Sequence, residues 1–208
     1  MKNLEDVANT IESRLEEKYQ VREIAIKSAR VITRLSGSIV HAIHSGGETS
    51  LMMHEAIDET HRLRSLLDAY PELWHSGLVE GALQELAEAT ILIALLNDED
   101  IPDPDHMGIP VNAYLLGLAD TVGELRRFAL EKLREGKPEE SAKYLDIMEE
   151  IFQMIMMFDY PDALISIRRK QDIARSLLEK TRGDVAVALN SARLQNKLDS
   201  LSQKMDQK

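Results

Sequence analysis

Residues 83–96 read LQELAEATILIALL, an apolar run of helix-forming residues that carries two carboxylates, Glu85 and Glu88. At 100° per residue, the two glutamates lie about 60° apart on a helix. The same sector of the helix holds four leucines, Leu78, Leu92, Leu95 and Leu96. Because a carboxylate on an apolar face is desolvated, it must be paired, protonated or bound to a cation. The stretch therefore predicts a largely buried helix with an acidic pair that needs a partner.

The composition predicts an all-α fold. The 208 residues are 44% hydrophobic and 4% aromatic, and the dominant residues, among them Leu, Ala, Glu and Lys, are good helix formers. The absence of Cys excludes disulfides, thiolate metal sites and a Cys nucleophile. The N-terminus lacks the apolar core of a signal peptide, and no apolar run approaches the roughly 20 residues that span a bilayer. We therefore expect a cytoplasmic protein with no membrane partner.

Glycine and proline divide the chain into helical segments within a single domain over residues 1–208. We predict seven, with breaks at Gly46–Gly47, Pro71, Gly136, Pro161 and Gly183. Their approximate ranges are 4–44, 48–69, 71–96, 111–135, 138–158, 161–181 and 184–203. Residues 97–110 are predicted to form a loop because they are rich in Pro, Asp and Gly, and residues 204–208 a frayed tail.

A second acidic pair, Asp120 and Glu124, lies in GLADTVGELRR (residues 117–127), again on one helix face. The same face carries the small residues Ala113, Gly117 and Gly123, so that a neighbouring helix or a substrate backbone can approach it closely. Two helices with two inward carboxylates each can build an oxygen-rich site for a hard divalent cation. The alternatives are a structural ion pair to Arg126 or Arg127 and, for the first pair, leucines that face a partner subunit.

The first helix carries a basic face within an arc of about 100°, formed by Lys27, Arg30, Arg34, His41 and His44. The opposite face holds Ile24, Val31, Leu35, Ile39, Ala42 and Ile43. Over roughly 25 Å, the basic face could contact several phosphates, although a solvated helix face is the simpler interpretation. The net charge of −11 argues against a protein that binds nucleic acid by positive charge dispersed over its whole surface. Whether this chain can bind nucleic acid therefore depends on this local cluster of basic residues.

Three other patterns favour structural interpretations. A second basic cluster, made of Arg168, Arg169, Lys170, Arg175, Lys180 and Arg182, could simply complement a helix C-terminus. The six histidines form no HExxH or ExxH motif, and His106 is expected to be exposed in the acidic loop. The Met-rich stretch FQMIMMF (residues 152–158) is predicted to lie in the core or in a subunit interface.

Two motifs, QELAEA (residues 84–89) and YLLGLADTVGELRR (residues 114–127), closely resemble those of the translin/TRAX family, on the TRAX side. DYPDALISIRRKQDIAR (residues 159–175) resembles the family's C-terminal LRRKxD-type helix. The resemblance covers about residues 20–195. It implies a seven-helix fold that assembles into closed octamers with an interior that holds nucleic acid.

The resemblance also implies an activity. TRAX-type subunits supply a metal-dependent endoribonuclease, and their catalytic acids map onto Glu85, Glu88 and Asp120, with Glu124 as a fourth member. Because translin-type subunits lack the full set, this chain is expected to be a catalytic TRAX-like subunit. A compact chain of this kind is expected to form a homo-oligomer in an archaeal cytoplasm.

The residues and the resemblance together predict a mechanism. Glu85, Glu88, Asp120 and Glu124 would bind Mg²⁺ or Mn²⁺, which would polarise the phosphodiester and activate a water for in-line attack. One of these carboxylates could instead act as a general base. The basic face would hold single-stranded or short duplex RNA, or single-stranded DNA, by its phosphates. Two alternatives stay open, a non-catalytic translin-like single-strand-binding protein and an all-α MazG-type nucleoside triphosphate pyrophosphatase.

Overall fold

The structure, a computed structural model, describes residues 3–206, which form eight helices and contain no strand. The all-α prediction is therefore confirmed. The described part of the chain forms two compact units, whose boundary falls inside α6, after Gly117. The helices are α1 (Leu4–Ser45), α2 (Ser50–Leu66), α3 (Pro71–Trp74), α4 (Gly77–Leu96), α5 (Pro104–Met107), α6 (Val111–Arg134), α7 (Pro138–Ile155) and α8 (Arg168–Asp206). The prediction of a single domain over residues 1–208 stays a prediction.

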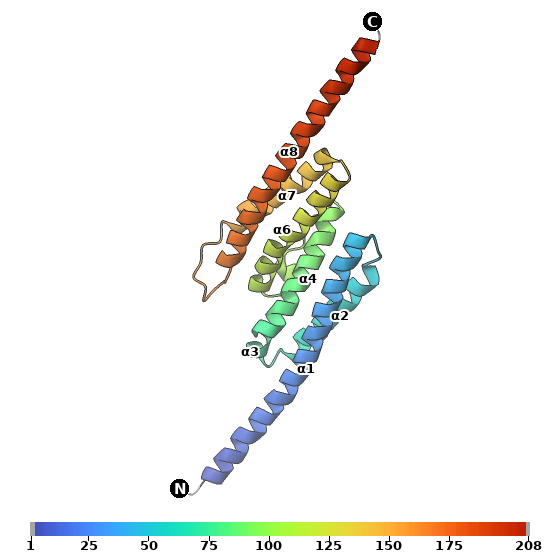
Figure 1. The fold of residues 1–208 in the computed structure, drawn as a ribbon. Coiled ribbons are helices and arrows are strands. Elements are labelled where there is room, and N and C mark those ends of the chain that lie inside the picture. Colours follow the sequence, from blue (N-terminus) through green and yellow to red (C-terminus); the bar gives the residue numbers. More distant parts are fainter. Residues whose placement is uncertain (1–2, 207–208) are drawn as a thin grey trace. The chain divides into compact units, whose positions relative to one another are not determined.

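In the first unit, α1 packs along both α2 and α4 (Figure 1). The face of α1 that packs inward carries mostly small and aliphatic residues, namely Ala25, Ala29, Ile32, Leu35, Ser36 and Ile39. Ile24 was expected on this face but is 49% exposed, because it lies at the edge of the buried stripe and nearer to the N-terminus than the first buried residue, Ala25. The helix ends at Gly46, whose φ of 69° is the left-handed conformation that favours glycine, as the sequence predicted.

Two predicted boundaries in this unit differ from the structure. The segment predicted over 71–96 is two helices, because Ser76 adopts an extended conformation between α3 and α4 and its Oγ donates to the Leu73 carbonyl at 2.6 Å. The predicted loop over 97–110 contains the single turn of α5. Its N-terminus is capped by the Asp103 carboxylate, which accepts from the His106 backbone N–H at 2.7 Å.

In the second unit, α7 packs along α8. Gly136 ends α6 with a φ of 74°, and Pro138 occupies the first turn of α7, both as predicted. The buried Ser141 hydroxyl donates to the Ala129 carbonyl at 2.8 Å and so ties the start of α7 to α6. The rings of Phe128 and Tyr144 stack 5.6 Å apart on the same pair of helices.

The two last predicted helices were wrong in their boundaries. Pro161 opens no helix, because the segment after α7 runs without regular structure and buries Ile165 and Ile167. Gln171 in the first turn of α8 donates to the carbonyls of Ile155 and Phe158 at 2.8 and 3.1 Å, and these bonds satisfy the end of α7.

Gly183 does not break the chain but lies inside the single helix α8, between the buried Thr181 and Val185. A helix tolerates an interior glycine at a cost of about 1 kcal/mol, which the burial of its neighbours offsets. The predicted frayed tail is helical as far as Asp206, and residues 207–208 lie outside the described part.

Candidate functional site

The first acidic pair lies in the middle of α4. Glu85 and Glu88 are one turn apart and both half-buried. Of the leucines predicted to share their sector, Leu92 is fully buried, whereas Leu78 is 47% exposed. The carboxylates therefore lie at the edge of a mostly apolar surface, where they are partly removed from water.

The turn that carries this pair is also the place where the start of α6 meets α4. A Cβ built on Gly117 would lie 2.5 Å from the carbonyl oxygen of Gln84, 2.8 Å from the Cβ of Ala87 and 3.0 Å from the backbone nitrogen of Glu88. No side chain fits at these distances, so only glycine permits this close approach. The prediction that small residues let a neighbouring helix approach is confirmed at this position.

The second acidic pair lies on α6 in the second unit. Asp120 Oδ1 accepts a hydrogen bond from Lys170 Nζ, at the start of α8, at 2.5 Å. Glu124 Oε2 lies 3.9 Å from Arg127 Nη1, at the limit of an ion pair. Arg126, an expected partner of this pair, instead donates to Thr181 and Asp184. The contact between Glu124 and Arg127 is one of the ion pairs that the sequence offered as an alternative.

The donor atoms suit a hard divalent cation. All four candidate ligands are half-buried carboxylates, and Mg²⁺ and Mn²⁺ prefer oxygen ligands. The Lys170 ammonium lies beside Asp120, so this carboxylate is accessible to a cationic group. Within residues 3–206, no three His, Asp or Glu side chains are already arranged to hold a metal ion. The metal site formed by Glu85, Glu88, Asp120 and Glu124 therefore stays a prediction.

The basic face of α1 is turned to solvent. Lys27, Arg30, Arg34 and His41 are exposed and His44 is half-buried, on the side of α1 opposite its buried stripe. Among the described residues, no carboxylate forms an ion pair with Lys27, Arg30 or Arg34. These charges are therefore available to a ligand.

The second basic cluster is different, because ion pairs within the second unit engage several of its members. Besides Lys170, Arg168 pairs with Asp159 at 3.4 Å and Arg182 with Glu149 at 2.6 Å. The cluster begins at the N-terminus of α8 and not, as expected, near a helix C-terminus. Since the helix dipole disfavours cations at an N-terminus, these ion pairs offset an unfavourable position.

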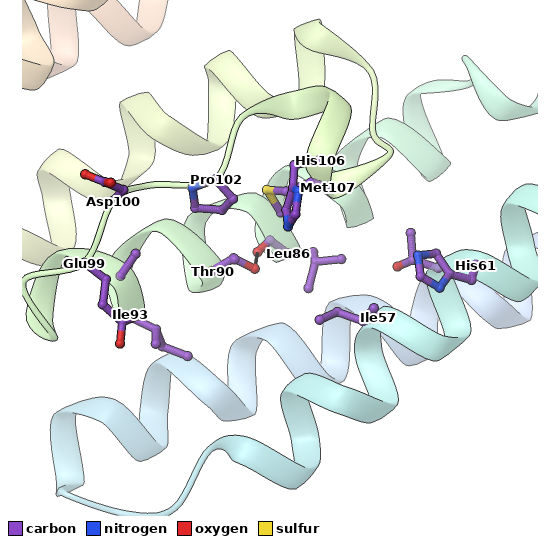
Figure 2. A pocket seen from close by; sticks show the side chains of 12 residues that line it. Ile57, His61, Leu86, Thr90, Ile93, Glu99, Asp100, Pro102, His106 and Met107 are labelled. Carbon is purple, nitrogen blue, oxygen red and sulfur yellow. Dashed lines mark hydrogen bonds between the residues drawn. The ribbon is translucent and has the colours of Figure 1, made fainter.

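Sequence reasoning did not predict a pocket of about 440 Å³ in the first unit, between α2, α4 and the segment after α4. Figure 2 shows Ile57 and His61 on α2, Leu86 on α4 and His106 on the segment after α4, around this pocket. His106 is exposed, as predicted. None of the predicted acidic or basic site residues lines this pocket. The Pro- and Asp-rich composition of residues 97–110 was the only signal in the sequence that pointed to this region.

The fold and the candidate site together define an all-α protein with acidic pairs on two helices and a basic face on a third. More specifically, the chain belongs to the translin family, because a sequence model of that family matches residues 18–183. Family membership, predicted from the two motifs, is thus confirmed. None of the helices over residues 3–206 combines the length and the apolar character that a bilayer span requires.

Relatives and solved structures agree with this membership. An uncharacterised protein of Methanocaldococcus jannaschii is 33% identical over 196 residues, which cover 93% of this chain and 87% of that protein. The structure of AfC3PO in complex with duplex RNA matches with a TM-score of 0.81 at 34% identity, over 90% of this chain and 98% of that one. Apo-NeC3PO, with a TM-score of 0.69 at 20% identity and the same coverage, shares the fold.

Proposed function

We propose that this chain is a metal-dependent endoribonuclease of the TRAX-like type, which binds RNA inside a closed homo-oligomer, with an octamer as the expected size. The observation that carries the proposal is the set of four half-buried carboxylates, Glu85, Glu88, Asp120 and Glu124, on two helices of a translin-family chain. Carboxylate oxygens are the ligands that Mg²⁺ and Mn²⁺ prefer, and a divalent cation held by such ligands would serve phosphodiester chemistry.

In the proposed site, Glu85 and Glu88 on α4 and Asp120 and Glu124 on α6 hold Mg²⁺ or Mn²⁺ by their oxygens. When bound, such a cation supplies Lewis-acid polarisation of the phosphodiester and activation of water. Gly117 lets the first turns of α6 pack against the turn of α4 that carries Glu88, where a bulkier residue would collide with the Gln84 carbonyl and with Ala87. A carboxylate that binds no cation would be able to accept the proton of the attacking water.

Binding is assigned to the basic face of α1. Lys27, Arg30 and Arg34 are exposed and His41 and His44 add two groups that can be protonated, so the face fits a run of phosphates. Such contacts read the backbone and not the base sequence. The complex of AfC3PO with duplex RNA, at 34% identity, supports RNA as the ligand of this chain.

A second candidate is a translin-like protein that binds single strands without cutting them. The ion pair between Lys170 and Asp120 favours it, because one of the four carboxylates already has a cationic partner. A nucleoside triphosphate pyrophosphatase of the MazG type has no comparable support, since the family match is to translin.

One experiment separates the three functions. End-labelled single-stranded RNA, short duplex RNA and single-stranded DNA are incubated with the protein in Mg²⁺, in Mn²⁺ and in EDTA, beside an assay of pyrophosphate release from nucleoside triphosphates. The proposal expects internal cleavage of RNA that EDTA abolishes. Binding without cleavage in either metal would support the non-catalytic protein, and triphosphate hydrolysis without RNA cleavage would support the pyrophosphatase.

A further inference from the structure

Both ends of the described chain carry exposed apolar ridges with the same spacing. The N-terminal ridge consists of Leu4, Ala8, Ile11 and Leu15 on α1, and the C-terminal ridge of Leu194, Leu198, Leu201 and Met205 on α8. In each ridge the successive intervals are four, three and four residues, which is the heptad repeat of helices that pair as coiled coils. Each ridge is about 16 Å long, so the two match in length.

Neither ridge is covered within its own unit. Leu4, Ile11 and Leu15 are 61%, 53% and 62% exposed. Leu194, Leu198, Leu201 and Met205 are between 56% and 78% exposed. The first turns of α1 run on beyond the other helices of the first unit, and the last turns of α8 run on beyond α6 and α7 (Figure 1). Polar contacts from α1 to the segment around α3 include Glu17, which accepts from Tyr70 Oη, and Lys18, which pairs with Glu72, and both residues follow the N-terminal ridge in sequence.

The charges beside the two ridges are complementary. Glu5 and Glu12, seven residues apart, flank the N-terminal ridge, and Lys197 and Lys204, also seven apart, flank the C-terminal ridge. In heptad notation the glutamates occupy e positions and the lysines g positions, which face each other when two helices pair in parallel. Residues 4–19 contain five acidic and two basic residues, whereas residues 190–205 contain three basic and one acidic. Each ridge therefore repels its own kind and attracts the other.

We propose that the N-terminal ridge of one subunit pairs with the C-terminal ridge of a second copy of this chain. The N-terminal ridge is open to such a contact, since Ala8, Ile11, Leu15 and Tyr19 form an exposed apolar strip on α1 with Glu12 and Glu16 beside them. The contact joins two different surfaces, so each subunit donates one ridge and accepts one, and repetition closes a ring when the rotation between subunits permits. This inference rests on the homo-oligomer in the proposed function but not on the nuclease activity.

Charge reversal tests the pairing directly. One variant, Glu5→Lys/Glu12→Lys, makes both ridges basic, and the other, Lys197→Glu/Lys204→Glu, makes both acidic. Each full-length protein is examined by sedimentation velocity at micromolar concentration, alone and in an equal mixture. Circular dichroism verifies that helicity is unchanged, as expected for exposed side chains. A matched control, Glu55→Lys/Glu150→Lys, reverses two exposed charges away from both ridges.

We expect the wild type and the control to form the same oligomer, each reversal variant alone to sediment as smaller species, and the mixture to regain the large oligomer. The pairing is overturned if either variant alone assembles like the wild type, or if both dissociate and the mixture stays dissociated. A monomeric wild type would overturn both the pairing and the homo-oligomer. RNA cleavage by the wild type is scored separately, so that its loss would contradict only the nuclease.

Discussion

Lys170 Nζ lies 2.5 Å from Asp120 Oδ1 and joins the start of α8 to α6 across 50 residues of sequence. Each side chain retains 27% of its exposure, so the pair is partly shielded from solvent. The ammonium occupies a position from which a divalent cation would bind the same carboxylate. Metal binding in the proposed site would therefore compete with this ion pair.

Replacing Lys170 tests this competition. Lys170→Met should destabilise the protein in EDTA by about 1 kcal/mol, because a partly shielded ion pair is lost. Mn²⁺ should then raise the melting temperature of the variant more than that of the wild type, since no ammonium has to be displaced. Arg175→Met, which removes an exposed pair with Asp172 on the same helix, is the control and should leave the effect of Mn²⁺ unchanged. Equal Mn²⁺ effects on wild type and Lys170→Met would show that Lys170 and the cation do not share Asp120.

Gly117 provides a test of the packing that brings α6 to the acidic turn of α4. Gly117→Ala should destabilise the protein by about 2 kcal/mol, because its Cβ would collide with the Gln84 carbonyl and with Ala87. Gly81→Ala on α4 is the matched control, since its Cβ would meet no atom within 4 Å. That change should stabilise the helix by up to about 1 kcal/mol. Urea unfolding followed by circular dichroism measures both changes, and equal stabilities for the two variants would contradict the close approach.

The basic face of α1 can be tested by the salt dependence of RNA binding. Arg30→Ala/Arg34→Ala should weaken binding and lower the slope of log affinity against log salt by about 0.9 for each lost phosphate contact. The control is Arg62→Ala/Arg134→Ala, which removes the same amount of charge from exposed positions outside the basic face. This control should leave the slope of log affinity against log salt mostly unchanged. Fluorescence anisotropy over a range of KCl concentrations gives both slopes. If the two double variants behave alike, the effect comes from net charge and not from this face.

The turn between α6 and α7 predicts one pH effect. Hydrogen bonds from Lys137 and Lys132 hold the pKa of the Glu135 carboxyl below its ordinary value of 4.5. Because the folded-state pKa is the lower one, this carboxylate contributes stability above the ordinary pKa that is lost as the pH falls through the folded-state value. The melting temperature of Glu135→Gln should therefore fall less than that of the wild type when the pH is lowered from neutral to acidic. Glu139→Gln is the control, and an unchanged pH dependence of Glu135→Gln would contradict this assignment.

Local signals predicted much of the fold. Gly46 and Gly136 end helices in the left-handed conformation, and Pro71 and Pro138 begin them, as expected from residue type alone. The segment around Pro161 was predicted wrongly because its conformation follows from tertiary burial of Ile165 and Ile167, which no local pattern reveals.

Of the candidate site, too, the sequence predicted the local features but not the contacts between distant parts of the chain. Helical periodicity predicted the partial burial of Glu85, Glu88, Asp120 and Glu124, because it depends only on spacing along one helix. The partner of Asp120 was not predicted, since Lys170 lies 50 residues away on another helix, in a basic cluster that was interpreted as complementing a helix C-terminus. The pocket beside His61 and His106 was missed for the same reason, because its walls come from three separate parts of the chain.

The central claim is that the four carboxylates organise a metal that cuts RNA, and single-turnover cleavage with Mn²⁺ tests it most directly. Wild type, Glu85→Gln, Asp120→Asn and the exposed control Glu55→Gln are compared at saturating protein, with RNA binding measured in parallel. We predict that Glu85→Gln and Asp120→Asn bind RNA as tightly as the wild type but cleave it at least about 100-fold more slowly, while Glu55→Gln is unchanged. Cleavage by Glu85→Gln and Asp120→Asn at the wild-type rate, or a wild type that binds RNA and never cuts it, would contradict the claim.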